Sequence, residues 1–274
     1  MPADDQTILS CLIRTLPRPL GRELGLALSF ATHVRKVVDD VALSRVDRLA
    51  ALYRIEQDLD AIAAGDRPPA LQVCRALAFV ATARGLPLEP LRNLVAAARD
   101  DLTTDRYGNF GELMVHVRCA ANPIGRLALH LCDAASPRNV ALSDGLCCGL
   151  WLTEMLRDVP HDLVHGRLYL PLEDLERHRV TEAQITAHQA TGGWRALMMF
   201  EIERARRMVQ AGAPLGRVLG GGAGFDTRVL VLAAERILKK LHEAPGDVFT
   251  RRPEITKGDW PYLIGRALVP RYRP

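Results

Sequence analysis

Apolar residues recur every three or four positions along most of the chain, and short polar segments rich in glycine and proline separate these stretches. Apolar positions at this spacing form one face of an α-helix, which is buried against neighbouring helices. No stretch shows the alternation of apolar and polar residues that is typical of a half-buried strand. The pattern predicts an all-α fold with helices over residues 21–40, 45–64, 70–84, 89–101, 111–132, 194–211 and 225–242.

Polar residues and helix breakers refine where these helices begin and end. Ser143 or Asp144 can cap a further helix that runs through the following apolar segment, and Thr181 can cap a short one after it. The pair Asn122-Pro123 is expected to interrupt or bend its helix, because proline lacks the N–H that the helix needs. The glycine run at 220–224 follows no predicted strand, so it indicates a flexible turn before the next helix and not a nucleotide-binding loop.

The composition suits one globular domain over residues 1–274, because 48% of the residues are hydrophobic. A net charge of +4 is compatible with an anionic substrate or a membrane surface, but an aromatic content of 5% argues against a nucleic-acid surface on which bases stack. No run approaches the ~20 apolar residues of a membrane-spanning helix, and the N-terminus lacks a signal peptide's apolar core. Free thiols in a reducing cytosol are expected for all six cysteines, which form no CxxC pair: Cys11, Cys74, Cys119, Cys132, Cys147 and Cys148.

Three carboxylates recur at intervals of four residues in the segment 151–175, at Glu154, Asp158 and Asp162. Residues four apart lie on the same face of a helix. An acidic ladder on a helix usually faces solvent, but apolar residues surround this one. Buried carboxylates repel one another unless a metal ion or a basic partner lies among them. Two basic residues beside the ladder could hold an anion, Arg157 and Arg167.

A second acidic pair, Asp39-Asp40, lies at the end of the first long predicted helix. Mg²⁺ prefers carboxylate and phosphate oxygens in octahedral geometry. Two facing acidic clusters in a helical bundle can therefore hold a diphosphate through bridging metal ions, while apolar helix faces enclose a hydrocarbon carbocation. The alternative is that the pair is an exposed helix end. The two-cluster interpretation predicts that Asp39 and Asp158 face each other across one cavity.

The same segments carry a resemblance to a known family. The stretch LTEMLRDVPHDLVHGRLYLPLEDL resembles the second aspartate-rich motif of the squalene/phytoene synthase family, and KVVDDVA resembles its first motif. DLTTDRY at 101–107 and GELMVHVRCAANPIGRLALHL at 111–131 are similar to the segments between them. The segments ANPIGRLALHL, ALSDGL and DVFTRRPEITKGDW are most similar to the branch that makes hydroxysqualene in bacterial hopanoid pathways.

The resemblance implies an isoprenoid-synthase-like helical bundle with a central cavity, in which a Mg²⁺-dependent enzyme ionises a prenyl diphosphate. The leading expectation is conversion of presqualene diphosphate to hydroxysqualene. Two alternatives stay open. One is head-to-head prenyl transfer, as in presqualene diphosphate, squalene or phytoene synthases. The other is a catalytically weakened relative that binds a lipid or a partner enzyme of the same pathway.

Site residues carried over from the family's motifs fall into three groups. The catalytic acids would be Asp39, Asp40, Asp158 and Asp162. The ligands of Mg²⁺ would be Asp39, Asp158, Asp162 and Glu154. The residues that contact or brace the prenyl diphosphate would be Lys36, Arg106, Tyr107, Asn122, Arg126, Arg157 and Arg167.

The substrate and product implied by the resemblance are largely insoluble in water, which suggests a cytoplasmic protein with a peripheral contact to the inner membrane. Basic and apolar residues near the C-terminus are the expected contact points: Arg251, Arg252, Trp260, Tyr262 and Arg271. An ordinary basic surface would show the same composition.

Several positions depart from the family's motifs. Leu43 stands where the first motif has a third acid, so one metal ligand is missing. Lys36 replaces an arginine and Glu154 replaces an asparagine, which alters the charge distribution or the hydrogen-bonding geometry. Pro160 lies between two aspartates of the ladder and is expected to kink the helix. Other residues stand where many relatives have tyrosine: Thr32, His116 and Cys119.

Overall fold

The computed structural model of the chain describes residues 18–244 and 246–269. Every regular element within these residues is a helix, and a single β-bridge, between Arg106 and Leu168, belongs to no strand. The predicted all-α fold is therefore confirmed. The elements follow in the order α1 (Arg18–Asp39), α2 (Arg45–Ala64), α3 (Gln72–Arg84), α4 (Glu89–Asp100), α5 (Phe110–Leu131), α6 (Pro137–Val164), α7 (Leu172–Arg177), α8 (Glu182–Thr186), α9 (Trp194–Gly212), α10 (Leu215–Val218), α11 (Gly221–Glu243), a 3₁₀ turn (Lys257–Asp259) and α12 (Trp260–Leu268).

Two of the predicted helix starts are wrong. Helix α6 begins at Pro137, where the hydroxyl of Ser136 accepts a hydrogen bond from the backbone N–H of Asn139 at 3.3 Å. Serine before proline is a strong helix start, so Ser143 and Asp144 lie inside α6 and do not cap it. The glycine run supplies the first turn of α11, so it is not a turn that precedes the helix.

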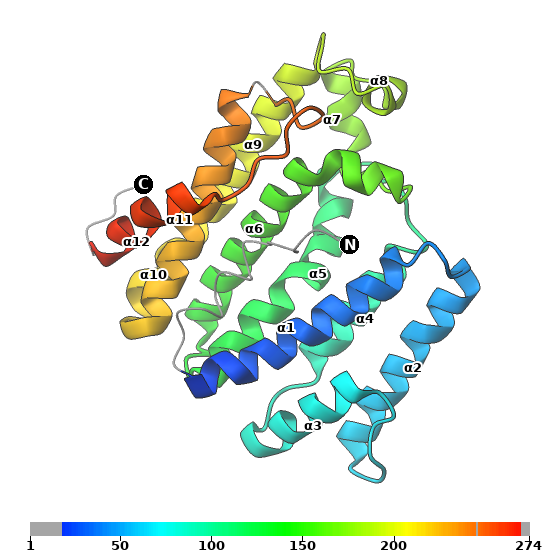
Figure 1. Ribbon diagram of the computed structural model, residues 1–274, viewed down its shortest axis with the longest axis vertical. Helices are drawn as coiled ribbons and strands as arrows, with labels where there is room; N and C mark the ends of the chain where they lie inside the picture. Colours follow the sequence, from blue (N-terminus) through cyan, green and yellow to red (C-terminus); the bar gives the residue numbers. More distant parts are fainter. Residues whose placement is uncertain (1–17, 245, 270–274) are drawn as a thin grey trace.

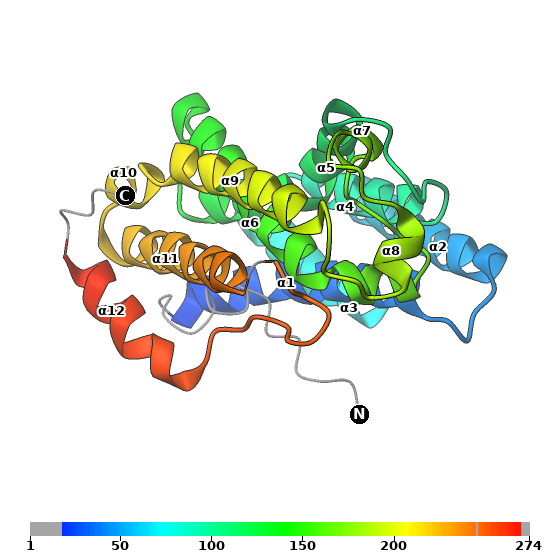
Figure 2. The ribbon, with the colours of Figure 1, turned by 90° about the horizontal axis from the view of Figure 1, so that it is seen from above.

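Helix α6 lies at the centre of the molecule and packs against α5 on one side and α9 on the other (Figure 1). The first half of α5 contributes to a buried apolar cluster with α6, α9 and α11. Its second half contributes to another buried cluster with α1, α2, α3 and α4. Both clusters are thus joined through α5. Figure 2 shows α1 and α11 together on one side of the central helix α6.

A small apolar cavity of about 70 Å³ lies where α1, α5, α6, α10 and α11 meet. Its walls come from the N-terminal halves of α1 and α6, from the second half of α5 and from the short α10 and the start of α11. The lining includes Leu20, Leu24, Ile124, Ala128, Leu146, Leu150, Leu215 and Leu230. This cavity lies among the central helices, but its lining includes neither Asp39 nor Asp158, which were expected to face each other across one cavity.

Among the helices that the structure describes, none combines the length and the apolar composition needed to cross a membrane. Five of the cysteines are confirmed as free thiols: Cys74, Cys119, Cys132, Cys147 and Cys148. Cys11 lies outside the described residues, as does Arg271 of the expected membrane contact.

Candidate active site

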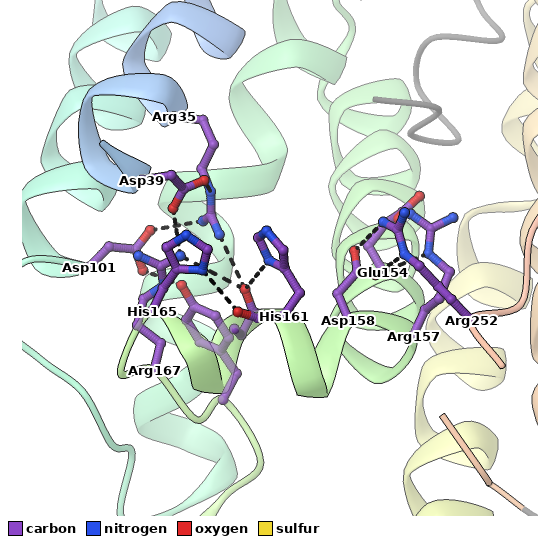
Figure 3. Close-up of polar contacts among 12 residues, drawn as sticks. Arg35, Asp39, Asp101, Glu154, Arg157, Asp158, His161, His165, Arg167 and Arg252 are labelled. Atoms are coloured by element: carbon purple, nitrogen blue, oxygen red, sulfur yellow. Dashed lines mark hydrogen bonds and ion pairs between the residues drawn. The ribbon is translucent and has the colours of Figure 1, made fainter. Parts of the chain in front are cut away.

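Three helices end close together and bring three carboxylates from distant parts of the chain around Arg35. Its guanidinium donates to Asp39 on α1 at 2.8 Å, to Asp101 after α4 at 3.2 Å and to Asp162 near the end of α6 at 3.3 Å. Figure 3 shows Arg35, Asp39 and Asp101 converging. We call Asp39, Asp101 and Asp162 the acidic cluster. Burial alone would lower the pKa of Arg35, but the cluster and nearby Tyr169 raise it well above its ordinary value.

A second arginine, Arg167, closes the acidic cluster from the side of α6. The chain turns at Gly166, which has a φ of 80°, and this left-handed conformation favours glycine. The turn directs Arg167 back toward α1, where it donates to Asp39 at 2.6 Å and lies 3.9 Å from Asp162. Arg167 is buried, and its Nε atom has no acceptor among the described residues. One buried donor of the site is therefore left unsatisfied by the part of the chain that the structure describes.

The carboxyl group of Asp39 is ionised in this environment. Burial works against the charge, but Arg35 and Arg167 outweigh it and hold the pKa of Asp39 below its usual range. On the other side of the site, His161 lies 3.6 Å from Asp162, which raises the pKa of the imidazole. Asp39 therefore acts as an anion beside two permanently charged guanidinium groups.

The acidic ladder of α6 divides between two sets of partners. Asp162 belongs to the acidic cluster, whereas the two carboxylate oxygens of Asp158 accept from Arg252 at 2.6 and 3.0 Å. Arg157 bonds to Glu154 and lies 3.4 Å from Asp158. Figure 3 shows these two groups apart, with Asp158 directed toward Arg252. The carboxylate that approaches Asp39 is thus that of Asp162, and not that of Asp158 as the sequence suggested.

Pro160 offers a physical reason for this division. It stays within α6, yet it cannot donate a hydrogen bond to the carbonyl of Leu156. Figure 1 shows the C-terminal end of α6 turning away from the axis of the longer first part. The two aspartates on either side of the proline therefore do not follow the regular alignment of residues four apart.

Aromatic side chains pack together next to the acidic cluster, and we call this group the aromatic floor: Tyr107, His116, Trp151 and Tyr169. The hydroxyl of Tyr169 donates to Asp101 at 2.5 Å, and the hydroxyl of Tyr107 donates to Asp100 at 2.9 Å. His116 lies between the two acids, 2.8 Å from Asp100 and 3.4 Å from Asp101. Its hydrogen bond is the main reason why the pKa of Asp100 falls to about 2. His116 also packs on the rings of Tyr107, Tyr169 and Trp151.

The remaining predicted residues lie outside the acidic cluster. Lys36 and Asp40 are exposed, and the Asp40 carboxylate accepts from the Ala42 N–H in the turn after α1. Arg106 forms two 2.8 Å hydrogen bonds to Glu182 and one to the carbonyl of Gly166, so it braces the loop that carries Arg167.

Asn122 and Arg126 lie at a second cavity of about 330 Å³, formed with residues of α4, α6 and α9. Arg126 is paired there with Asp144 at 2.7 Å, and the Asn122 side chain accepts from the Cys148 thiol at 3.2 Å. The structure therefore does not bring these two residues to the acidic cluster.

Sequence reasoning missed several members of the site: Arg35, Asp101, Tyr169, His116 as a partner of the acids, and Arg252. One signal was present for Arg35, because it precedes Asp39 by four residues on the same helix and can reach it along one face. The others contact the site over long sequence separations, which no local pattern reveals.

The donor atoms of the site suit Mg²⁺, because carboxylate oxygens are the protein ligands that this ion prefers. Their present arrangement is different. Among residues 18–244 and 246–269, no group of three or more acidic, histidine or cysteine side chains is gathered as a metal ion would require. Arg35 and Arg167 occupy the space between Asp39 and Asp162 instead. The carboxylate oxygens are chemically suited to Mg²⁺, but in this structure they form ion pairs with Arg35 and Arg167.

Polar and apolar parts of the site lie along the same two helices. Leu24 and Arg35 are about 16 Å apart along α1 by the helical rise, and Leu150 and Asp162 about 18 Å along α6. The N-terminal halves line the apolar cavity, while the C-terminal ends carry the acidic cluster. The charged and the apolar parts of the site thus lie toward opposite ends of the same two helices.

Comparisons with known proteins agree with this geometry. The family model described as squalene/phytoene synthase matches residues 9–259. A phytoene synthase from Arthrospira platensis is 30% identical over 222 residues, which cover 76% of this chain and 71% of that protein. The squalene synthase HpnC from Alicyclobacillus acidocaldarius has a TM-score of 0.79 and 29% identity, covering 86% of this chain and 88% of that one.

A dehydrosqualene synthase crystallised with a ligand shares the fold, with a TM-score of 0.86 at 18% identity over 97% of this chain and 91% of that one. The match to the family model extends over most of the sequence and includes both segments that supply the acidic cluster from α1 and α6. The chain belongs to the squalene/phytoene synthase family, whose members are head-to-head prenyl transferases that act on prenyl diphosphates.

Proposed function

We propose that the chain is a Mg²⁺-dependent isoprenoid synthase that ionises presqualene diphosphate and forms hydroxysqualene. The observation that carries this proposal is the alignment of a charged cluster and an apolar cavity along α1 and α6. In this reaction the C–O bond breaks and diphosphate leaves with the electron pair. Water then captures the rearranged carbocation and loses a proton.

The diphosphate end of the substrate would bind the arginines around the acids. The buried Nε atom of Arg167 has no acceptor among the described residues, and a phosphate oxygen would satisfy it. Arg157 and Arg252 already lie together at Asp158 and could turn to the same anion. Arginine suits this role because its planar fork matches two oxygens at once.

Mg²⁺ would be held by Asp39, Asp158 and Asp162, with Glu154 as a further ligand, and it would neutralise charge on the departing diphosphate. Asp40 is exposed in the turn next to Asp39 and would support the site electrostatically. The aromatic floor has a separate role. Tyr169 and His116 hold Asp101 in place and close that side of the acidic cluster.

Head-to-head transfer between two prenyl diphosphates is the second candidate. It is favoured by the phytoene synthase from Arthrospira platensis, whose name describes such a product. A catalytically weakened relative is the third, favoured by Leu43, which is partly exposed after α1 and offers no third carboxylate.

The deciding experiment is incubation of the purified protein with presqualene diphosphate and Mg²⁺, followed by extraction of the products. Hydroxysqualene is the expected product. Parallel incubations with farnesyl or geranylgeranyl diphosphate test head-to-head transfer through the appearance of presqualene diphosphate, squalene or phytoene. Absence of turnover in all three incubations would contradict the enzymatic proposals and leave the weakened relative.

A peripheral contact with the inner membrane is a further part of this proposal. Helix α12 exposes several apolar side chains, and Arg251 and Arg252 precede it on the surface. The exposed apolar residues at the end of the described chain are Tyr262, Ile264, Leu268 and Val269. A short helix of this kind can insert its apolar side chains into the headgroup region.

A further inference from the structure

We propose that Arg35 is an internal counter-cation that competes with divalent metal for the acidic cluster and thereby sets how tightly the site takes up Mg²⁺. This inference rests on the proposed function and deepens it, because it concerns the same carboxylates. It gives a regulatory role to Arg35, whereas the resemblance to the family's motif pointed only to its neighbour Lys36.

The contacts of Arg35 are the first argument. Its three nitrogens each reach a different carboxylate, at 2.8 Å to Asp39, 3.2 Å to Asp101 and 3.3 Å to Asp162. These acids come from the ends of three helices that are far apart in sequence. A guanidinium at this point therefore performs the task that a metal ion would perform, which is to hold mutually repelling carboxylates together.

The balance of charge is the second argument. The acidic cluster has three carboxylates, and the cations in contact with it are Arg35, Arg167 and, when protonated, His161 and His116. Arg167 cannot balance all three acids alone. Removing Arg35 would leave the buried Asp101 without a guanidinium partner, and the buried Asp162 with only Arg167, 3.9 Å away. A divalent cation is the species best able to replace that charge.

Accessibility is the third argument. The side chain of Arg35 keeps 39% of its exposure, whereas those of Asp101 and Asp162 keep 7% and 9%. Arg35 can therefore leave the cluster toward solvent while the acids stay in place. Arg35 thus holds the three acids together in this structure, and metal with diphosphate would displace it toward solvent.

The missing acid of the first motif fits this interpretation. Leu43 occupies its position and lies exposed in the segment between α1 and α2, so it contributes no oxygen to the site. A site with fewer oxygen ligands binds Mg²⁺ more weakly. A resident arginine then competes effectively, and diphosphate is needed to bring the metal in.

The test is binding of Mg²⁺ alone, measured by titration calorimetry and thermal melts on the full chain, in the wild type and in Arg35→Gln. We expect the wild type to bind Mg²⁺ in the millimolar range with little change in melting temperature. Arg35→Gln is expected to melt lower without metal, to bind Mg²⁺ at least tenfold more tightly, and to recover melting temperature as Mg²⁺ is added.

The matched control is Arg22→Gln, which removes the same charge from an exposed position on the same helix. It should leave both the melting temperature and the Mg²⁺ affinity at wild-type values. A second variant, Arg35→Gln with Asp162→Asn, removes one acid along with the arginine. It should regain melting temperature without metal and lose the gain in Mg²⁺ affinity.

Equal Mg²⁺ affinity in the wild type and Arg35→Gln would overturn the proposal. If Arg35→Gln does not fold, Arg35→Lys keeps the charge but not the three-way fork, and its Mg²⁺ affinity should exceed that of the wild type; unchanged affinity would again overturn it. If the proposed function itself is wrong, inorganic pyrophosphate with Mg²⁺ will leave the melting temperature of the wild type unchanged. This result distinguishes failure of the proposed function from failure of the inference about Arg35.

Discussion

Arg252, in the segment between α11 and α12, donates to both carboxylate oxygens of Asp158, at 2.6 and 3.0 Å. This pair ties the C-terminal segment to the central helix α6 beside the acidic cluster. It also places a guanidinium and a carboxylate of the proposed diphosphate site in direct contact. The two residues therefore connect the position of the C-terminal segment with the proposed diphosphate site.

The first prediction concerns Asp158→Asn. The substitution removes one charged partner of Arg252 and one proposed Mg²⁺ ligand, so turnover of presqualene diphosphate should fall by about a hundredfold or more. Mg²⁺ with pyrophosphate should raise the melting temperature of the wild type by binding linkage, and that of the variant less. Activity assays and thermal melts with and without these ligands provide the measurements.

The control for Asp158→Asn is Glu254→Gln, which removes an exposed charge 3.7 Å from the same arginine. It should change unfolding free energy by no more than about 0.5 kcal/mol and leave turnover near the wild-type value. Equal ligand-induced shifts in the wild type and Asp158→Asn would contradict a role of Asp158 in metal and diphosphate binding.

A second prediction concerns the close contact between α6 and α9. A methyl group on Gly149 would lie 2.5 Å from the backbone nitrogen of Val209, so Gly149→Ala requires the two helices to move apart. We expect a loss of about 1–3 kcal/mol in unfolding free energy. Chemical denaturation measures it.

Gly145 offers the matched comparison one turn earlier on the same helix. A methyl group there would lie 3.7 Å from the nearest atom, which belongs to Gly212, and this is an ordinary contact. Gly145→Ala should stabilise the protein by up to about 1 kcal/mol, because alanine favours the helix more than glycine does. If Gly149→Ala is as stable as Gly145→Ala, α6 and α9 are not closely packed at Gly149.

The third prediction is a dependence of stability on pH that comes from Glu201. Burial raises the pKa of its carboxyl group to about 8, although Arg204 works in the opposite direction. In the unfolded chain the group titrates near its ordinary value of 4.5. Between these values the folded state keeps a proton that the unfolded state has lost, so unfolding free energy should fall as pH rises from about 5 to 8.

Glu201→Gln mimics the protonated carboxyl group and should flatten this pH dependence. Near pH 8 its unfolding free energy should exceed that of the wild type by an amount on the order of a few kcal/mol. Glu203→Gln, an exposed neighbour on α9, should keep the slope of the wild type. Urea denaturation at several pH values decides the matter. A wild-type slope in Glu201→Gln would show that another group causes it.

A fourth prediction concerns the exposed apolar residues of α12. Vesicles that contain anionic lipid should bind the protein at low salt and carry it upward in a density gradient. Ile264→Ser combined with Leu268→Ser should reduce this binding severalfold, because less apolar area enters the headgroup region. Phe79→Ser changes an exposed apolar residue on the distant α3 and should have no effect. Binding that is unchanged in the α12 variant would exclude α12 as the contact.

Much of the fold could be predicted because helical periodicity is a local property of the sequence. The bounds of α2, α5 and α9 followed closely from apolar spacing. The start of α6 did not, since several polar residues precede its apolar face and each could cap a helix. Only the structure shows that Ser136 and its following proline perform this task.

Less of the candidate site could be predicted from the sequence. Asp39 and Asp162 were both expected to contribute, and the structure brings them together through Arg35 and Arg167. The regular spacing of the ladder suggested that Asp158 would join them, but the proline within the ladder breaks the alignment on which that expectation depended. Asp101 could not be assigned locally, because the two residues that donate hydrogen bonds to it, Arg35 and Tyr169, lie more than sixty residues away.

The convergence of three helix ends has an electrostatic consequence of its own. Helices α1, α4 and α6 all present their C-termini to the acidic cluster. The free carbonyl groups of a helix C-terminus carry roughly half an elementary negative charge. The backbone alone therefore gives this region a negative electrostatic potential, apart from any charge on the side chains. A diphosphate approaching alone would be repelled, so we expect the site to admit it together with cations, and its affinity for pyrophosphate to rise steeply with the concentration of Mg²⁺.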